Sequence, residues 1–557
     1  MLRKTKRWIS LGITVVMLAS LLAGCGQRDN TDKTDKTPSN QSETDKKTEE
    51  NKTADDSSRP TFKVATVRWT DSWPTDFLES GVMKELEDKH NINIDWQVYY
   101  YADWVEQKSL LLASGDLPDA FLGSISLQSA DIAQNKSYFI ELTDLINENM
   151  PNLTAAFEKA PELRAIATGR DGKIYSLPKK LPKRPVVCGN VGYINKKWLD
   201  NLGLAMPKTY KELADVLVKF AQEDADGDGD STNEIPFTGA AGATVLSNDL
   251  RNILSPFGTM VSRSNDYMGL NGEGKPVFMP VQENYKEAVK WMHELYAAGA
   301  VDPEYFTQEG SMAMAKRQAE GGSKVGFLFG WTADAEAGIN SSEFALLEAV
   351  EGPDGNHYVE NAMTALDIAD RELVITTKCS DPAKLLQWAD DFYTDLVALQ
   401  TFYGSIPDYI TDNGGTYHVE KPSDGSSLDT SAWSNSLRDF GPKFMNPEFY
   451  DKITLPEDQG DGIKLSEDAV NAKYVTTDKN VGFPVVQYTE EELAKLAQLG
   501  TDIYKYCEAQ YAHWVVDGGI EEEWDAYLQQ LNNMGLQELI GIQENAFNFY
   551  KEAMKAQ

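Results

Sequence analysis

An acidic loop is the segment of this chain whose residue types and spacing most directly suggest chemistry. Side-chain oxygens occupy its first, third and fifth positions, and Gly229 allows a sharp turn at the sixth. This spacing, with a carboxylate further on, fits a calcium loop, because calcium takes about 6–8 oxygen ligands. Acids this close repel one another without a cation, and a solvated acidic turn is the alternative interpretation. The expected ligands are Asp224, Asp226, Asp228, Asp230, Asn233 and Glu234.

The usual catalytic nucleophiles and bases show no comparable arrangement. No Gly-x-Ser-x-Gly motif or Cys/His arrangement presents a nucleophile. A glycoside hydrolase or polysaccharide lyase stays open as an alternative, since two carboxylates about 5–10 Å apart can suffice and the chain has 87 acidic residues. The histidines share no short metal-binding spacing and are expected to be surface or satisfied core residues: His90, His293, His357, His418 and His513.

Strands and helices alternate where the fold begins. Strands are expected over residues 62–67 and 91–98 and from Leu117, with helices over 80–90 and 103–114 between them. This order predicts a parallel sheet with crossover helices, and such sheets bind ligands beyond the carboxyl ends of their strands. A site is therefore expected beside the residues that follow the first strand, which include Arg68, Trp69 and Trp73.

The last third of the chain has helical patterns. Thr489 followed by Glu492 forms a capping box for a helix to about residue 510, and further helices are expected over residues 521–533 and from Leu536. About 500 folded residues exceed what one hydrophobic core serves. Two lobes are therefore predicted.

The N-terminus predicts export and a lipid anchor. Basic residues precede an apolar run over residues 8–23, which is shorter than the ~20 residues of a membrane span. The run ends in Leu-Ala-Gly-Cys, which resembles a lipobox, so residues 1–24 are expected to be a signal peptide and Cys25 the acylated, palmitate-bearing N-terminus. Residues 25–60 are polar, as in a disordered tether. An ordinary signal with an incidental cysteine is the alternative.

The formal net charge is −35, which argues against nucleic-acid partners because an acidic surface repels phosphate backbones. It also disfavours anionic polymers as ligands, although a local basic cleft could override the average. The remaining cysteines, Cys188, Cys379 and Cys507, fit neither a zinc motif nor a disulfide framework. They are expected to be small buried residues, with at most one pair bridged.

Short motifs follow one another through the folded part, at residues 113–119, 171–178, 193–196, 207–210, 296–304, 402–404, 523–527 and 534–536. In this order and spacing they resemble the family-one extracellular solute-binding proteins of ABC importers, above all the LipO-type lipoproteins and the alginate-binding proteins. The resemblance implies an α/β, two-lobed periplasmic-binding-protein-like fold (type II-like) with a helix-rich second lobe and a hinge of crossing strands. Residues 61–557 would form this solute-binding part.

The implied lobes can be given approximate boundaries. One lobe is expected at about residues 61–175 plus a return segment at about 324–375. The other is expected at about residues 180–320 plus about 380–557. The motif at 171–178 resembles the first crossing between them.

The acidic loop also resembles a loop of this family, which ends in Asp-Glu-Ile-Pro. Here one residue is inserted before Asn233 and asparagine replaces aspartate, so Glu234 is the better candidate for a last ligand. Glu234 comes too early to be the bidentate twelfth-position glutamate of a standard EF-hand. The resemblance implies a structural calcium ion away from the cleft rather than a calcium switch.

The resemblance implies a monomeric receptor without enzymatic activity, anchored on the outer face of a Gram-positive cell membrane. It would capture a carbohydrate between its lobes and deliver it to an ABC permease; a receptor for a peptide or other solute, or a sensor subunit, remains open. Sugars stack on aromatic rings, so aromatic residues in loop-like stretches are candidate contacts, with core packing as the alternative. The aromatic candidates are Trp69, Trp73, Trp331, Tyr403 and Trp433, and Arg68 is added for its place at the end of the first strand. Trp291, Trp388 and Trp524 lie in helical patterns and are expected in the core.

Overall fold

The computed structural model describes residues 59–181, 188–240, 242, 244–262, 265, 267–360, 368–475 and 482–555. The expected signal peptide, Cys25 and all but the end of the expected tether lie outside the described residues. Within the described part, no helix combines the length and the apolar character that crossing a bilayer requires.

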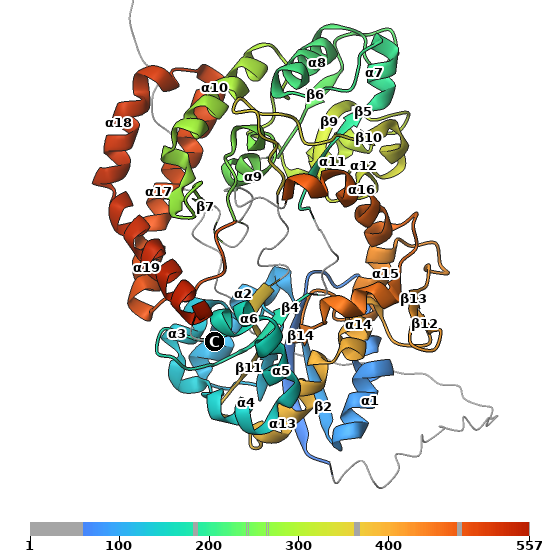
Figure 1. Ribbon diagram of the computed structural model, residues 1–557, viewed down its shortest axis with the longest axis vertical. Helices are drawn as coiled ribbons and strands as arrows, with labels where there is room; N and C mark the ends of the chain where they lie inside the picture. Colours follow the sequence, from blue (N-terminus) through green and yellow to red (C-terminus); the bar gives the residue numbers. More distant parts are fainter. Residues whose placement is uncertain are drawn as a thin grey trace, which may run out of the picture. The chain divides into compact units, whose positions relative to one another are not determined.

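A six-stranded sheet is built around the first predicted strands (Figure 1). β1 pairs in parallel with β2 and β3, as the alternation of strands and helices predicts. β11 enters from far along the chain and pairs antiparallel with both β3 and β4. In sheet order the strands are β14 (Lys443–Phe444), β4 (Leu177–Lys180), β11 (Ile368–Ile375), β3 (Ala120–Leu122), β1 (Thr61–Arg68) and β2 (Asn93–Tyr100).

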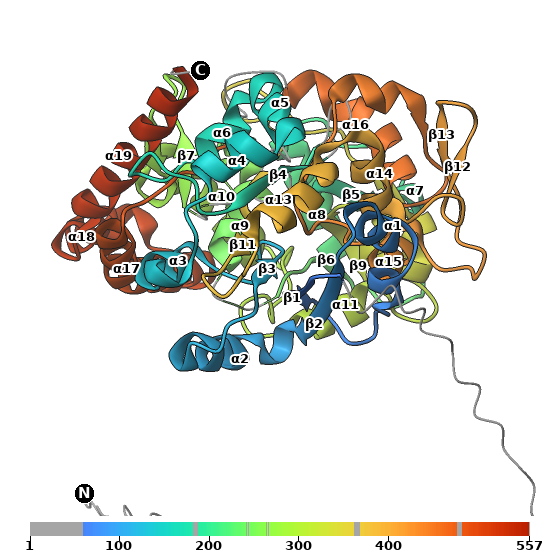
Figure 2. The same ribbon diagram turned by 90° about the horizontal axis from the view of Figure 1, so that it is seen from below.

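Helices cover both faces of this sheet, because successive side chains along each strand point to opposite sides. Phe62, Val64 and Leu122 lie in one core cluster, whereas Val67 and Phe121 lie in another. Figure 2 shows α2 (Tyr101–Ser114) on one side of the sheet and most other helices on the opposite side. Those helices are α4 (Thr143–Asn149), α5 (Pro151–Lys159), α6 (Pro161–Ala167) and α13 (Pro382–Asp390); α1 (Gly81–His90), α3 (Ser129–Gln134) and α14 (Asp395–Tyr403) complete this part.

A four-stranded sheet forms the second centre of the fold. Its order is β10 (Phe344–Leu346), β5 (Val191–Asn195), β9 (Val325–Gly330) and β6 (Ile235–Phe237). The helices of this stretch of chain are α7 (Lys196–Leu202), α8 (Tyr210–Gln222), α9 (Val245–Arg251), α10 (Glu283–Ala297), α11 (Gly310–Arg317) and α12 (Ala333–Ala337). Smaller sheets pair β7 (Met268–Leu270) with β8 (Pro276–Phe278), and β13 (Tyr417–Val419) with β12 (Ile410–Asp412) and β15 (Ile453–Thr454).

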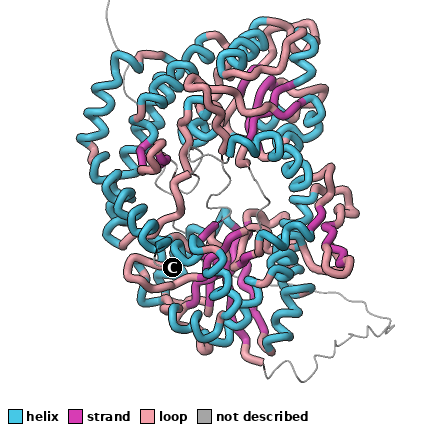
Figure 3. The backbone as a smooth tube through the Cα atoms, in the orientation of Figure 1, coloured by secondary structure: helices cyan, strands magenta, loops and turns pink. Residues whose placement is uncertain are grey.

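The C-terminal helices join the core of the four-stranded sheet, to which Trp198, Trp514 and Leu539 all belong. Thr489 makes the predicted capping box with Glu492. Figure 3 shows how much of the backbone is helical around the two sheets. The last helices are α15 (Leu428–Asn435), α16 (Gly460–Val475), α17 (Glu490–Asp517), α18 (Ile520–Asn533) and α19 (Leu536–Lys555).

Two separate large cores, each with its own sheet, confirm the predicted two-lobed α/β fold with a helix-rich second part. The chain changes sheet between Lys180 and Val191, because β4 still pairs with β11. This place lies after the motif at 171–178 that was expected to make the crossing. The chain changes back between Leu346 and Ile368, so β9 and β10 of the expected return segment belong to the four-stranded sheet and β11 to the other.

Candidate ligand-binding site

A cavity of about 550 Å³ lies where β1 and β3 end. Trp69 and Ser124, which follow these strands, line it together with Asp370 at the start of β11. Phe483 and Tyr488, from the segment before α17, line it from the part of the chain that belongs to the other core. The cavity therefore lies beyond the carboxyl ends of parallel strands, where open α/β sheets bind ligands.

A second cavity of about 320 Å³ adjoins the first. Ser129, Asp370, Arg371 and Tyr488 line both. The second cavity extends past Tyr175 toward the first turn of α17. Together the two cavities offer space for a ligand longer than a single sugar ring.

An aromatic cluster forms one wall of the larger cavity. Trp69 is 40% exposed, and its ring lies 4.7 Å from that of Tyr101 and 5.9 Å from that of Phe440. Phe440 contacts Trp433 at 5.6 Å, and Trp433 stacks on Trp73 at 4.9 Å. The structure thus brings three of the predicted tryptophans together, and of these three only Trp69 lines the cavity.

Phe440 was not among the predicted site residues although it lines the cavity. It lies in a loop just before β14, and its neighbourhood carries none of the motifs found in the sequence. Only its position between Trp69 and Trp433 marks it as part of the cluster.

Arg68 is the last residue of β1 and is only 2% exposed. Its guanidinium donates hydrogen bonds to the main-chain carbonyls of Ser436, at 3.2 Å, and of Trp433. Burial lowers its pKa to about 10. Arg68 therefore holds the end of β1 against the loop after α15 and keeps the aromatic cluster in place.

The other two predicted aromatic residues lie beside α16. Tyr403 is 3% exposed, and its hydroxyl donates to Asp461 Oδ2 in the first turn of α16 at 2.8 Å. The ring of Trp331 lies 4.7 Å from Lys464 Nζ, one turn further along the same helix. Neither residue lines either cavity, so the structure separates them from Trp69.

The larger cavity is also lined by charged residues that were not among the predicted site residues. Lys179 is 1% exposed, ion-paired with Glu372 at 2.9 Å, and donates to the main-chain carbonyl of Asp439. Arg371 donates to Ser129 at 2.8 Å and pairs with Asp370. In the sequence, the one hint of these charged residues is a lysine, Lys179, in a buried strand. Its partner Glu372 could not be foreseen, because β11, which pairs with β4, comes from far along the chain.

The acidic loop folds back on itself through its own backbone. Asp224 accepts hydrogen bonds from the N–H groups of Gly227 and Gly229, each at 3.0 Å. Carboxylate oxygens of Asp224, Asp226 and Asp228 all lie within 4.8 Å of one another. Three carboxylates held this close offer a set of oxygen ligands of the kind that a hard cation such as calcium requires.

Glu234 adds a fourth acid to this loop. One of its oxygens accepts the N–H of Ala225 at 2.9 Å, while the other is buried without a hydrogen-bond partner among the described residues. Burial raises its pKa above the ordinary value. Asn233 donates to Asp228 at 2.8 Å, and Asp230 accepts from Thr232 at 2.6 Å. The orphaned Glu234 oxygen fits a cation that the loop would bind.

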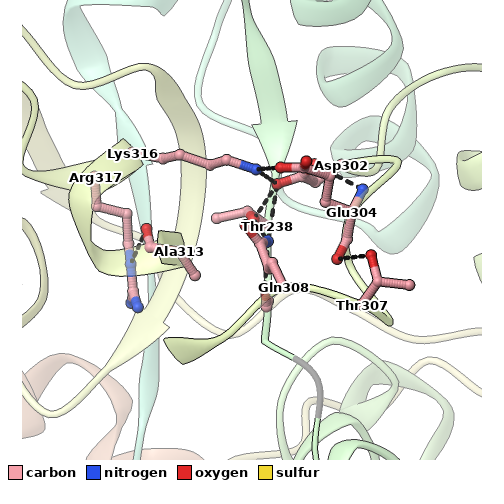
Figure 4. A network of polar contacts seen from close by, with 9 residues as sticks. Thr238, Asp302, Glu304, Thr307, Gln308, Ala313, Lys316 and Arg317 are labelled. Carbon is pink, nitrogen blue, oxygen red and sulfur yellow. Dashed lines mark hydrogen bonds and ion pairs between the residues drawn. The ribbon is translucent and has the colours of Figure 1, made fainter. Parts of the chain in front are cut away.

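The motif at residues 296–304 forms a buried network at the end of β6 (Figure 4). Asp302 Oδ2 accepts hydrogen bonds from Thr238 at 2.6 Å, Gln308 at 3.0 Å and Lys316 at 2.7 Å. Burial acts to raise the pKa of Asp302, but the hydrogen bonds from Lys316 and Thr238 outweigh it and leave the pKa below its usual value. The network fastens α11 to β6 and has a structural role.

The histidines, the described cysteines and the tryptophans expected in the core are hydrogen-bonded or buried within the protein. Each of the five histidines has a hydrogen-bond partner in the protein, as His90 has in Asp391 at 2.7 Å. Cys188, Cys379 and Cys507 are buried, and no disulfide joins them. The expected core positions of Trp291, Trp388 and Trp524 are confirmed.

Comparison with known proteins gives a consistent family. The family model described as bacterial extracellular solute-binding protein matches residues 71–395. The fructooligosaccharide ABC transporter substrate-binding protein FusA of Streptococcus pneumoniae is 31% identical over 504 residues, which span 86% of this chain and 88% of FusA. Lipoprotein LipO of Bacillus subtilis is 23% identical over 55% of this chain and 52% of its own length.

Solved structures agree with the sequence comparison. FusA in complex with kestose has a TM-score of 0.72 at 27% identity, and a FusA EF-hand mutant in complex with fructo-nystose has 0.73 at 28%; each match covers 88% of this chain and 99% of the chain in the solved structure. The alginate-binding protein AlgQ2, at 19% identity, shares the fold with a TM-score of 0.65 over 88% of this chain and 99% of its own. The resemblance found in the sequence is confirmed, and the chain belongs to the bacterial extracellular solute-binding protein family.

Proposed function

We propose that this protein is the receptor of an ABC importer that captures an oligosaccharide in the two adjoining cavities and delivers it to the permease. The observation that carries the proposal is the cavity beyond β1 and β3, with Trp69 and Phe440 in its wall. Exposed aromatic rings suit the C–H faces of sugars, and polar side chains around them suit the hydroxyls. The similarity to FusA, a fructooligosaccharide ABC transporter substrate-binding protein, supports the same class of ligand.

The proposed lobes follow the two sheets. Residues 59–181 and 368–444 form one lobe, and residues 188–360 and 482–555 form the other, with α16 passing between them. Trp69 and Asp370 line the larger cavity from the first lobe, and Arg251 and Phe483 line it from the second. A ligand that touches both lobes shifts an open–closed equilibrium by its greater affinity for the closed state.

Catalysis is not part of the proposal. The protein holds the sugar without breaking a bond, and the permease and its ATPase supply the energy of transport. The cavity wall is supported by Trp73, Trp433 and Arg68. Trp331 and Tyr403 instead contact α16 and have a structural role there.

We also propose that the acidic loop binds a structural calcium ion. The carboxylates of Asp224, Asp226 and Asp228 and the unpaired oxygen of Glu234 would hold it, with Asp230 and Asn233 at the edge of the site. Bound calcium would neutralise the loop and fix the connection between α8 and β6. The FusA structure described as an EF-hand mutant supports a metal loop in a relative.

The proposed location rests on the family and on the N-terminal sequence. Cys25 would carry the lipid and hold a monomer at the outer face of a Gram-positive cell membrane, with residues 25–60 as a tether. Radiolabelled palmitate should be incorporated into the full chain and not into the Cys25→Ala variant. Equal incorporation into both would rule out this anchor.

Titration calorimetry with a panel of oligosaccharides tests the receptor function. We expect saturable binding of at least one glycan with one site per chain, and unchanged glycan when the mixture is analysed by chromatography. Binding of a peptide pool and of no glycan would show that the receptor takes peptides instead of sugars. Conversion of the glycan would instead identify a carbohydrate-active enzyme.

A further inference from the structure

The charged residues around the two cavities show a common pattern. Five cationic side chains of the described part line the cavities, and each has a carboxylate partner within the protein. The pairs are Lys136–Asp171 at 2.6 Å, Lys179–Glu372 at 2.9 Å, Arg170–Glu492 at 3.4 Å, Arg251–Glu360 at 3.5 Å and Arg371–Asp370.

Two carboxylates of the lining lack such partners. Asp439 in the larger cavity and Glu490 in the smaller one form no ion pair or side-chain hydrogen bond through their carboxylates with any residue in the described ranges. Asp439 is half-buried and directly precedes Phe440 in the aromatic wall. In the described lining each cation therefore has a carboxylate partner, whereas Asp439 and Glu490 form no ion pair; Asp439 acts only at longer range on the buried Arg438 and Lys443, whose pKa values its charge acts to raise.

An anionic sugar would enter this lining at a disadvantage. Its carboxylate would lose water on binding, and a buried charge needs a partner to offset that loss. The positive charges of the described lining are already offset by carboxylates of the protein, which weakens their attraction for an anionic ligand, and Asp439 would repel it. A neutral sugar meets no such cost, because its hydroxyls can donate hydrogen bonds to Asp439 while its ring stacks on Trp69.

We infer that the ligand is an uncharged oligosaccharide rather than a uronate, and that Asp439 is the residue that accepts its hydroxyls and excludes anionic sugars. This inference rests on the proposed function and narrows its substrate class. It agrees with the overall acidity of the chain, since the lining formed by the described residues is not a basic cleft that would override the net charge of −35.

The test compares an anionic tetrasaccharide with its uncharged ester and with two neutral tetrasaccharides. Tetragalacturonate and its fully methyl-esterified form are titrated into the calcium-loaded protein, together with the neutral tetrasaccharides nystose and xylotetraose. At least one neutral tetrasaccharide should bind at least about 100-fold more tightly than tetragalacturonate, since like charges at short range cost several kcal/mol at an effective dielectric near 20. Neutral binding should change less than about twofold between low and high salt.

Two variants test the residue itself. Asp439→Asn keeps the shape and removes the charge, and it should weaken the best neutral ligand at least about tenfold, because hydrogen bonds to a charged acceptor are about twice as strong as neutral ones. Asp525→Asn, on the exposed face of α18, serves as the matched control and should leave the affinity unchanged. Glu492→Gln keeps the capping pattern of α17 while releasing Arg170, and it should strengthen tetragalacturonate binding.

The outcomes separate this inference from the proposed function. Tetragalacturonate binding as tightly as its methyl ester, or more tightly than both neutral tetrasaccharides, overturns the inference and leaves the sugar receptor standing. An Asp439→Asn affinity within twofold of the wild type overturns the assigned role of Asp439. Failure of every glycan to bind a folded protein overturns the proposed function and the inference with it.

Discussion

The acidic loop and the ligand cavity both contain several acids, but they compensate the charge differently. In the loop, the acids lie within residues 224–234 and, in the part of the chain that the structure describes, accept hydrogen bonds from nearby backbone and from Thr232 and Asn233. Around the cavities, acids from distant segments pair with cations, as Glu372 does with Lys179. The acids of the loop repel one another unless a cation binds, whereas each cation of the described cavity lining already has a carboxylate partner in the protein.

Calcium removal is expected to give the largest effect that distinguishes the two regions. A chelator should lower the melting temperature by roughly 3–5 °C, because loss of an ion present at about 100 times its Kd costs about 2.7 kcal/mol and a lobe or chain of this size has a large entropy of unfolding. Asp224→Asn should melt near the chelated wild type even in calcium, since it removes a central oxygen charge. Scanning calorimetry measures both changes.

Asp502→Asn is the matched control for this experiment, because Asp502 is exposed on α17 and far along the chain from the loop. It should melt as the wild type does, with and without calcium. A wild-type melting temperature that the chelator leaves unchanged would remove the calcium site from the proposal.

The cavity wall should show the next largest effect, in affinity rather than stability. Trp69→Ala should weaken the best glycan at least about tenfold, which corresponds to about 1.4 kcal/mol, because it removes the exposed ring that lines the cavity. Trp331→Ala should change the affinity less than about threefold, since Trp331 packs beside α16. Calorimetric titration compares them, and equal losses in the two variants would contradict this placement of the site.

Tyr403→Phe should have the smallest effect. It removes the hydroxyl that donates to Asp461, so we expect a loss of about 1 kcal/mol in the free energy of unfolding. Glycan affinity should stay within about twofold of the wild type, because Tyr403 lines neither cavity. Urea denaturation and calorimetry measure the two quantities, and a large affinity loss with unchanged stability would place Tyr403 at the ligand after all.

Local sequence patterns were sufficient to predict those elements that depend on interactions between nearby residues. The capping box at Thr489 and the alternation along β1 each depend on residues a few positions apart. The acidic loop belongs to the same class, since its acids and turn glycines lie within residues 224–234. Most predicted helices and strands therefore match the structure to within a few residues, but α17 continues to Asp517, seven residues past its expected end near residue 510.

Long-range pairing decided the rest. β11 separates β3 from β4 in the sheet, and no pattern near residue 370 indicates which strands it will join. Long-range contacts also decide which predicted aromatic residues lie at the cavity. Trp69 lines it, whereas the hydroxyl of Tyr403 is hydrogen-bonded to Asp461, although both were expected in loops.

The sequence by itself determined the family, the two-lobed α/β class and the oxygen-rich loop, because each is encoded by motif order, composition or short spacing. Only the tertiary structure decided which aromatic ring faces the cavity and which cations there are already paired. Those properties depend on side chains such as Lys179 and Glu372, which lie 193 positions apart (372 − 179) and meet only when β4 and β11 pair.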